Sequence, residues 1–494
     1  MLSHVVRMPK MLPALSDGRQ SYTYADLACA VNGERRWLRS ANVRRCALLA
    51  ANGTGWVISD LALMANGVLT VPVPTYFTGA QMNHLLTDAG IEFVLTDQPA
   101  AFLTARAGFQ TVGTSPHTGF SLLRREQRAA EVALPTGTLK ITYTSGSTGA
   151  PKGVCLSRTA IDAVTKSLVD VTASLGVQRH MCLLPLATLL ENIAGVYVPL
   201  WLGAQVHVEP TAALGMSYEG VDAKLLLEAL RRGEPESLVL VPELLRLLTH
   251  ARGAGWQAAR PIKFIAVGGA SVATELLDRA IDVGLPTFEG YGLSECGSVV
   301  CLNTPAASRR GSVGRPLPHA NVRIDTNGEI CVRGATMLGY AGEPAGVTDE
   351  VRTGDLGEID ADGYVYVRGR AKNMFITSMG RNVAPEWVER ELTCESVIAQ
   401  AMVFGEGRPH AAALLSTTGQ VPSGAVNDAI ARANTRLPDY ARVRRWALFP
   451  EAPTPRTGLL TANGRLRRDR VLARFGSLIE SLYSTPQDAP HVVS

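Results

Sequence analysis

The chain has 494 residues, of which 46% are hydrophobic and 19% charged, and its net charge is +4. Because this length exceeds what a single hydrophobic core normally serves, two or more domains are expected. The composition is that of a globular protein, and the small positive charge argues against a dedicated nucleic-acid binder.

The cysteines and the apolar stretches indicate the compartment. The eight cysteines are scattered and form no Cys-x-x-Cys pair, so a reducing environment fits better than a disulfide framework or a zinc site. The most apolar stretch, Ile193–Val208, is interrupted by Pro199 and Gln205 and is too short to span a bilayer. Met1–Leu15 has no signal-peptide pattern, and we therefore expect a cytoplasmic protein without stable membrane insertion.

Short apolar strands alternate with amphipathic helices along the first half of the chain. Strands are expected at Cys46–Ala51, Leu69–Val73, Phe93–Thr96, Leu139–Tyr143, Ser237–Val241 and Phe264–Val267. Helices are expected between some of them, at Gly55–Asn66, Gln81–Ala89 and Glu243–Ala251. This rhythm predicts mostly parallel sheets covered by helices.

The pattern changes after Ala320. Short strands separated by turn signals such as Asn327-Gly328 are expected at Asn321–Asp325, Glu329–Arg333 and Tyr364–Arg368. Helix and strand patterns return after Gly369-Arg370, which predicts one domain at 1–369 and another at 370–494. The predicted fold class is α/β. It has a large N-terminal domain of two α/β subdomains plus a small β-rich subdomain, and a small mobile α+β C-terminal domain.

A loop rich in glycine and hydroxyl residues follows the expected strand at Leu139–Tyr143. It reads Thr144-Ser145-Gly146-Ser147-Thr148-Gly149-Ala150-Pro151-Lys152. Glycine lets backbone N–H groups approach an anion, hydroxyls donate to phosphate oxygens, and Lys152 adds positive charge. The loop is not the GxxxxGK[ST] phosphate loop, because Gly153 follows Lys152. From composition alone, a mobile loop without a ligand is the alternative interpretation.

Four further motifs follow this loop along the chain. They are Gly268-Gly269-Ala270, the EGYGLSE run at Glu289–Glu295, the RTGDLG run at Arg352–Gly357, and Gly369-Arg370-Ala371-Lys372. In this order they resemble the motifs of the adenylate-forming superfamily, which includes acyl-CoA synthetases, nonribosomal peptide adenylation domains and luciferases. The resemblance covers nearly the whole chain and is strongest to long-chain acyl-CoA synthetases.

The resemblance implies a role for each matched residue. The residues that would wrap the β- and γ-phosphates of ATP are Thr144, Ser145, Gly146, Ser147, Thr148, Gly149 and Lys152. The nucleotide side would be formed by Gly268, Gly269, Ala270, Glu289, Gly290, Tyr291 and Gly292, with the Tyr291 ring stacked on adenine. Ser294 would contact the α-phosphate, and Glu295 would bind Mg²⁺. Asp355 and Arg370 would hold the ribose, and Lys372 would be the hinge of the C-terminal domain. Taken singly, Asp355 is also typical of a turn and Tyr291 of a core.

One position departs from the family pattern. Members usually carry a lysine in a C-terminal motif like TPxGKLxR, whereas Leu460–Arg468 reads LTANGRLRR, with Arg465 in place of that lysine. Arginine keeps the charge, but its planar fork is larger than a compact ammonium group. Arg465 therefore either takes over the catalytic role or leaves adenylation slow, or the chain is a non-catalytic acyl or nucleotide binder. We favour the first interpretation because the other motifs are intact.

The acyl site is expected near Leu183–Gly195, which reads LLPLATLLENIAG. It resembles the PLAHxxER segment of long-chain acyl-CoA synthetases, with Thr188 and Asn192 replacing the usual histidine and arginine. The apolar lining favours an acyl chain over an amino acid. A medium- or long-chain fatty acid is the first choice, and an aryl or other small organic acid is the second. The implied reaction forms acyl-AMP with ATP and Mg²⁺ and passes the acyl group to coenzyme A. Loading of a carrier-protein phosphopantetheine or an amine is the alternative.

Overall fold

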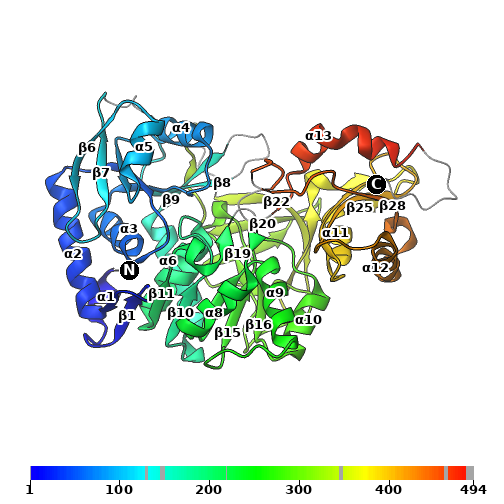
Figure 1. Ribbon diagram of the computed structural model, residues 1–494, viewed down its shortest axis with the longest axis horizontal. Coiled ribbons are helices and arrows are strands. Elements are labelled where there is room, and N and C mark those ends of the chain that lie inside the picture. The colour runs from blue at the N-terminus through cyan, green and yellow to red at the C-terminus, as the bar shows by residue number, and fades with distance from the viewer. Residues whose placement is uncertain are drawn as a thin grey trace.

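The computed structural model describes residues 2–127, 132–144, 151–217, 220–343, 349–454, 456–460 and 465–484. Two large sheets with their helices form most of the N-terminal part, and a smaller β-rich unit follows them (Figure 1). A three-stranded sheet with three helices forms the C-terminal part, at the right of Figure 1.

The first sheet has eight strands in the order β21-β9-β8-β4-β3-β5-β7-β6. Its central strands β8, β4, β3 and β5 are parallel, as the sequence predicts, and antiparallel strands complete both edges. The strands are β3 (Arg45–Leu49), β4 (Leu69–Pro72), β5 (Phe93–Thr96), β6 (Phe109–Thr114), β7 (Ser121–Arg125), β8 (Thr138–Thr144), β9 (Lys152–Ser157) and β21 (Gly339–Tyr340). The helices between or before them are α2 (Tyr24–Ser40), α3 (Thr54–Asn66), α4 (Gly79–Asp88) and α5 (Pro99–Ala105).

The second sheet has nine strands in the order β18-β17-β16-β15-β14-β10-β11-β1-β2, and its centre is again parallel. Its strands are β1 (Pro13–Ser16), β2 (Ser21–Thr23), β10 (Arg179–Cys182), β11 (Gln205–Val208), β14 (Ser237–Leu240), β15 (Phe264–Val267), β16 (Thr287–Tyr291), β17 (Cys301–Leu302) and β18 (Arg315–Pro316). The associated helices are α1 (Leu2–Arg7), α6 (Arg158–Thr172), the π-helix η2 (Glu191–Tyr197), α7 (Val198–Leu202), α8 (Ala223–Gly233), α9 (Pro242–Gly253) and α10 (Thr274–Asp282).

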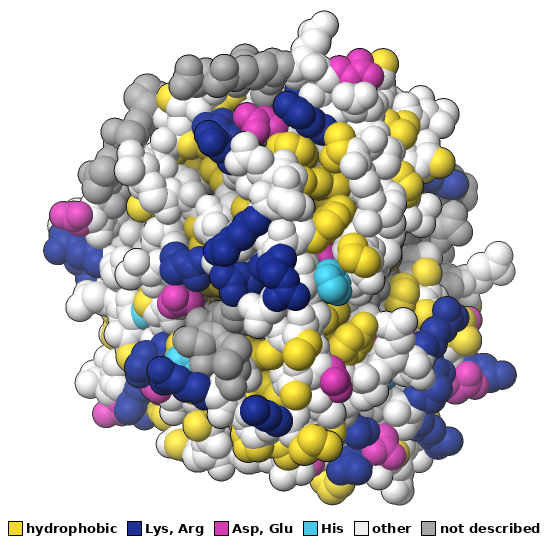
Figure 2. All heavy atoms as spheres, turned by 90° about the vertical axis from the view of Figure 1, so that its left-hand side faces the viewer, with side chains coloured by type: hydrophobic (Ala, Val, Ile, Leu, Met, Phe, Trp, Pro, Cys, Tyr) yellow, Lys and Arg dark blue, Asp and Glu magenta, His cyan; other side chains and the backbone are white. Residues whose placement is uncertain are grey.

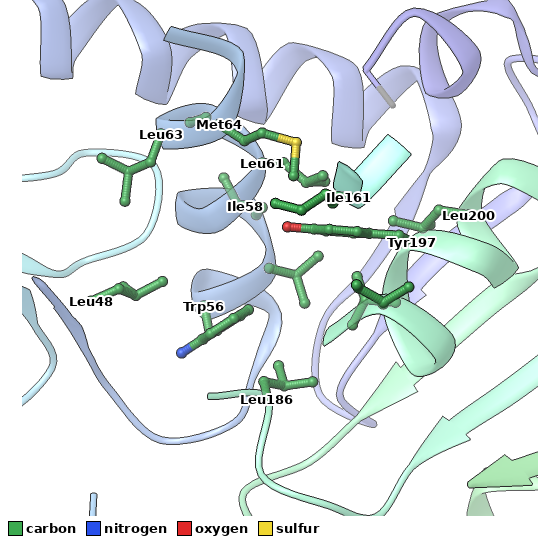
Figure 3. Close-up of a cluster of buried hydrophobic side chains, with 14 of the residues drawn as sticks. Leu48, Trp56, Ile58, Leu61, Leu63, Met64, Ile161, Leu186, Tyr197 and Leu200 are labelled. Atoms are coloured by element: carbon green, nitrogen blue, oxygen red, sulfur yellow. The ribbon is translucent and has the colours of Figure 1, made fainter. Parts of the chain in front are cut away.

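Helix α3 lies in the core shared by the two sheets. Its side chains from Trp56 to Met64 are buried on every face, and the hydrophobic ones among them form one cluster with residues of both sheets and of α6. Figure 3 shows Trp56, Ile58 and Leu61 of this helix beside Tyr197 and Leu200. A helix that is apolar all round is typical of such a central position.

A buried ion pair interrupts this apolar core. Lys140 Nζ on β8 lies 2.8 Å from Asp60 Oδ1 on α3, and both side chains are at most 2% exposed. The same ammonium donates to Asn192 Oδ1 at 2.5 Å and to the Tyr197 hydroxyl at 2.8 Å, both on the π-helix. Burial lowers the pKa of Lys140, and Asp60 opposes that shift. The pair therefore joins β8, α3 and the π-helix at one point.

The β-rich unit is a four-stranded antiparallel sheet in the order β19-β20-β22-β23. Its strands are β19 (Ala320–Ile324), β20 (Glu329–Gly334), β22 (Glu350–Ile359) and β23 (Val365–Arg370). The expected turn glycines Gly328 and Gly363 have φ values of +80° and +82°, which a residue with a Cβ adopts only with strain. The hairpins lie where the sequence predicts them.

The C-terminal part begins after β23 with the 3₁₀ turn η5 (Ala371–Asn373). Its main elements are α11 (Pro385–Thr393), β26 (Ile398–Phe404), β27 (Ala411–Thr417), α12 (Ser423–Thr435), β28 (Val443–Leu448) and α13 (Arg468–Ser481). They enclose separate hydrophobic clusters of their own. The boundary at residues 369 and 370, and the mobility of this part, stay predictions.

One face of the protein carries a group of positively charged side chains (Figure 2). Figure 2 shows Lys and Arg side chains gathered on the face that lies at the left of Figure 1, away from the C-terminal part. Helix α2, which is labelled on that side, carries the exposed cations Arg36 and Arg39. Within the part of the chain that the structure describes, none of the helices combines the length and apolar character needed to cross a membrane.

Candidate active site

The glycine- and hydroxyl-rich loop connects two paired strands. Thr144 ends β8 and Lys152 begins β9, and the two residues are partners in the antiparallel ladder. The predicted phosphate-binding residues Ser145, Gly146, Ser147, Thr148 and Gly149 lie outside the described residues. Both ends of the loop are therefore fixed by the sheet and line one cavity.

Lys152 has two partners near the edge of this cavity. Its ammonium lies 3.2 Å from Glu343 Oε1 and 4.6 Å from the centre of the Tyr340 ring. The side chains of Lys152 and Glu343 are 44% and 52% exposed. An ion pair with this much exposure to solvent contributes little to stability. Lys152 can thus leave Glu343 for a phosphate at small energetic cost.

Tyr340 links Lys152 to the predicted metal ligand. Its hydroxyl donates to Glu295 Oε1 at 3.1 Å, and its place on β21, paired with β9, puts it beside Lys152. Burial raises the pKa of Tyr340, and the charge of Glu295 adds to that shift. Sequence reasoning missed this residue, because the pairing of β21 with β9 joins segments far apart in the chain.

Two glycine turns follow the carboxyl ends of β15 and β16, where ligands bind in parallel sheets of this kind. Gly268, Gly269 and Ala270 form the first, and the φ of Gly269 is +79°, which favours glycine. In the second, a Cβ on Gly292 would lie 1.7 Å from the carbonyl oxygen of Ser298, so only glycine fits there. The turn leads into the 3₁₀ helix Ser294–Cys296, which carries Ser294 and Glu295 into the cavity wall.

Asp355 is held between two other predicted nucleotide contacts. Arg370 Nε lies 2.8 Å from Oδ1, and the Tyr291 hydroxyl donates to Oδ2 at 2.6 Å. The hairpin of β22 and β23 pairs Asp355 with Arg370, so the backbone fixes this ion pair. Burial raises the pKa of Asp355, and Arg370 opposes the shift. Asp355, Arg370 and Tyr291 therefore form one connected group.

The C-terminal part supplies Lys372 and Arg465 to the same cavity. Arg465 keeps part of its surface exposed, and the electric field of Asp355, Arg370 and Glu386 acts on it. Its surroundings lower its pKa through desolvation first and through the charge of Arg370 next, while Asp355 and Glu386 oppose the shift. A residue about 110 positions from Asp355 in the sequence thus comes within its electrostatic reach.

All the predicted site residues that the structure describes line one cavity of about 1020 Å³. They are Thr144, Lys152, Gly268, Gly269, Ala270, Glu289, Gly290, Tyr291, Gly292, Ser294, Glu295, Asp355, Arg370, Lys372 and Arg465. The cavity continues along the π-helix and α7, where Leu190, Ala194 and Val198 line it. It thus joins a polar end, suited to a nucleotide, to an apolar extension.

Glu289 is expected to make the stability of the protein depend on pH. Burial raises its pKa to about 8 from about 4.5, and the charge of Arg390 only partly opposes the shift. Between these values the folded state holds a proton that the unfolded state releases, so the group lowers stability as pH rises. We expect Glu289→Gln to remove a slope of about 1.4 kcal/mol per pH unit from the free energy of unfolding in this interval.

Urea denaturation from pH 5 to pH 8 measures that slope for the wild type and Glu289→Gln. Glu275→Gln, on α10, is the control for the loss of a carboxyl group that is only partly buried, and its effect on the slope is compared with that of Glu289→Gln. Equal slopes for wild type and Glu289→Gln would contradict the prediction.

Comparison with known proteins identifies the family. A model of the AMP-binding enzyme family matches residues 2–341, and a model of the AMP-binding enzyme C-terminal domain matches residues 372–487. The chain therefore belongs to the AMP-binding enzyme family. The expected superfamily and the expectation of an AMP-forming ligase type of enzyme are confirmed.

Three relatives illustrate the similarity. The long-chain-fatty-acid–CoA ligase FadD15 of Mycobacterium bovis is 26% identical, with 89% of this chain and 88% of that protein aligned. The feruloyl-CoA synthase of an Amycolatopsis species is 27% identical, with 95% and 98% aligned. The solved anthranilate CoA ligase AuaEII in complex with anthranoyl-AMP has a TM-score of 0.79 at 18% identity, covering 96% of each chain. The predicted α/β fold class is confirmed by this likeness.

Proposed function

We propose that this enzyme activates a carboxylic acid with ATP to an acyl-AMP and then transfers the acyl group to the thiol of coenzyme A. The observation that carries the proposal is the single cavity shared by Lys152, Glu295, Asp355 and Arg465. Two phosphate-side groups, a ribose-side acid and a basic residue of the C-terminal part thus face one space. The family membership and the names of the relatives, which are CoA ligases, agree with this assignment.

In the first half-reaction two anions, the carboxylate of the acid and the triphosphate of ATP, must approach each other. The acid's carboxylate oxygen bonds to the α-phosphorus of ATP, and the bond to the leaving pyrophosphate breaks. Positive groups that are already in place lower this barrier. Lys152 would act on the β- and γ-phosphates, and Arg465 on the carboxylate and the α-phosphate as they approach. Asp355, oriented by Arg370 and Tyr291, would accept hydrogen bonds from the ribose hydroxyls.

Glu295 is suited to hold Mg²⁺. Tyr340 engages Oε1, whereas Oε2 has no hydrogen-bond partner among the residues that the structure describes. A carboxylate oxygen facing a phosphate site is the ligand that Mg²⁺ prefers. When bound, the metal would offset the charge of the phosphates. The contribution of this chain is to fix the carboxylate through Tyr340 and the 3₁₀ turn.

The apolar extension of the cavity supports a fatty or aryl acid as the substrate, and a medium- or long-chain fatty acid is our first choice. This part is lined by Leu190, just before the π-helix, by Ala194 within it, and by Val198 and Leu202 of α7. Such walls bind an acyl chain or ring by excluding water. We further propose that the C-terminal part turns about Lys372 to admit the thiol in the second half-reaction.

Acid-dependent exchange of radiolabelled pyrophosphate into ATP tests the first half-reaction. We expect exchange with at least one of a panel of fatty and aryl acids, and none without Mg²⁺. Adding coenzyme A, a phosphopantetheine carrier protein or an amine then identifies the acceptor by the product formed. ATP binding without exchange for any acid would instead support a non-catalytic binder.

A further inference from the structure

The apolar part of the cavity runs along the face of the second sheet. Ser237 and Val239 of β14 and Phe264 and Ala266 of β15 are alternate strand residues, which share one face, and they form its floor with Val241 and Gly268 just beyond the two strands. Val241 and Gly268 lie at the nucleotide end. Ser237 and Phe264 lie four residues earlier, which corresponds to about 13 Å along an extended strand. The floor is apolar in its middle and becomes polar again at the far end.

The polar group at the far end is a hydrogen-bonded histidine and serine. His180 on β10 is the ladder partner of Ser237 on β14, and both line the cavity. The Nδ1 atom of His180 lies 2.8 Å from Ser237 Oγ. His180 is 3% exposed and Ser237 is 6% exposed, so this pair is enclosed by protein. A buried polar pair in an otherwise apolar wall calls for an explanation.

A third buried polar residue, Glu191, lies near His180. Glu191 of the π-helix is fully buried, its Oε1 accepts from the Leu183 backbone N–H at 3.1 Å, and it lies 3.9 Å from His180 Nε2. Neither His180 Nε2 nor Glu191 Oε2 has a hydrogen-bond partner among the described residues. A Cβ on Gly195 would lie 2.8 Å from Glu191 Oε1 and 3.1 Å from His180 Nε2. Glycine at position 195 therefore lets the carboxyl group approach the imidazole.

Ser237 retains hydrogen-bonding capacity toward the cavity. A hydroxyl has one donor and two acceptor positions, and His180 Nδ1 uses only one of them, whichever ring tautomer is present. Thr172 on α6, another hydroxyl residue that lines the cavity, already donates to the Leu168 carbonyl at 2.6 Å. Ser237 is thus the better placed of the two to bind a polar group of a ligand.

We propose that the acid activated by this enzyme carries a hydroxyl or similar hydrogen-bonding group at the end remote from its carboxyl, and that Ser237, oriented by His180, binds it. This inference rests on the proposed function, since the same cavity would hold the acyl group. Two kinds of acid carry a hydroxyl at this end, namely an aliphatic acid with a terminal hydroxyl and a phenolic aryl acid. A plain fatty acid would leave Ser237 facing only methylene groups.

Two matched pairs of acids test the inference. They are 10-hydroxydecanoic and decanoic acid, and 4-hydroxycinnamic and cinnamic acid. The measured quantity is the ratio of kcat/KM for the hydroxylated acid to that for its unsubstituted partner in pyrophosphate exchange. We expect the wild type to favour the hydroxylated acid about tenfold or more in one pair, and that pair identifies the kind of acid. Ser237→Ala should lower this ratio about tenfold.

Thr172→Val is the matched control. It removes a hydroxyl that lines the same cavity but has no expected contact with the acid. It should keep the wild-type ratio. Ser237→Cys preserves the size of the side chain with a weaker hydrogen bond and should also lower the ratio. Each ratio compares two acids on the same protein. The loss of active enzyme through partial unfolding of a variant therefore cancels in the ratio.

Binding of the same four acids, measured by isothermal titration calorimetry, separates this inference from the proposed function. A preference for the hydroxylated acid in binding, without exchange for any acid, would overturn the proposed reaction and keep the assignment of Ser237. Exchange or binding that is as strong with the unsubstituted acid in both pairs would overturn the assignment. So would an unchanged ratio in Ser237→Ala.

Discussion

Replacing Arg465 by alanine is expected to lower the rate of acyl-adenylate formation by about a hundredfold, because one preorganised positive group would be lost from the reacting phosphate. Arg465 lines the cavity with Lys152 and Glu295, and the charges of Asp355, Arg370 and Glu386 act on it. Pyrophosphate exchange under saturating ATP measures the effect. The loss should appear mainly in kcat, since the contact forms fully only in the transition state.

Arg465→Lys distinguishes the possible roles of this arginine. If Arg465 occupies the catalytic position, lysine should preserve or raise the rate of adenylation. A loss of several orders of magnitude would mean that the site is built around the planar guanidinium. Arg470→Ala is a suitable control on the same domain, because the Arg470 side chain is 57% exposed and lies outside the main cavity. An unchanged rate in Arg465→Ala would rule out a catalytic role.

Among the proposed substitutions, those that break the buried ion pair of Lys140 and Asp60 are expected to lower the free energy of unfolding most. Lys140→Met would leave Asp60 buried without its cation, which typically costs about 3–5 kcal/mol. Replacing both charges, as in Lys140→Met with Asp60→Asn, should recover most of that loss. Urea denaturation followed by tryptophan fluorescence measures both, since Trp56 is buried in the adjoining core.

A surface pair provides the matched control for this prediction. Lys166 and Asp170 on α6 form an ion pair at 2.5 Å, with side chains 63% and 44% exposed. Lys166→Met should change the free energy of unfolding by less than about 1 kcal/mol. Equal effects of Lys140→Met and Lys166→Met would contradict the structural role of the buried pair, as would a double variant no more stable than Lys140→Met.

Local patterns in the sequence predicted most of the elements. Strands at Phe93–Thr96 and Phe264–Val267 have the predicted bounds, and the helix expected at Gly55–Asn66 begins one residue earlier. The strand expected at Cys46–Ala51 lies instead at Arg45–Leu49, since its last apolar residues continue beyond the ladder with β4 and β5. Such ends depend on pairing partners rather than on local composition.

The contacts that complete the site could not be predicted in this way. Tyr340 meets Glu295 and Lys152 only because β21 pairs with β9, and His180 meets Ser237 only because β10 pairs with β14. Lys140 also gave no signal, because a lysine in an apolar strand does not reveal the buried acid that it faces. Part of the PLAHxxER-like segment lines the apolar part of the cavity, and its π-helical form was not predicted.

The sequence by itself determined the family and the α/β class. It also predicted the residues of a nucleotide site, because glycines, hydroxyls and charges at fixed spacings are local requirements of phosphate binding. Only the tertiary structure decided which of these groups share one cavity, which partners hold them, and where the apolar part of that cavity becomes polar again. Those outcomes depend on the pairing of strands and the packing of helices distant in the chain. Local spacing carries little information about either.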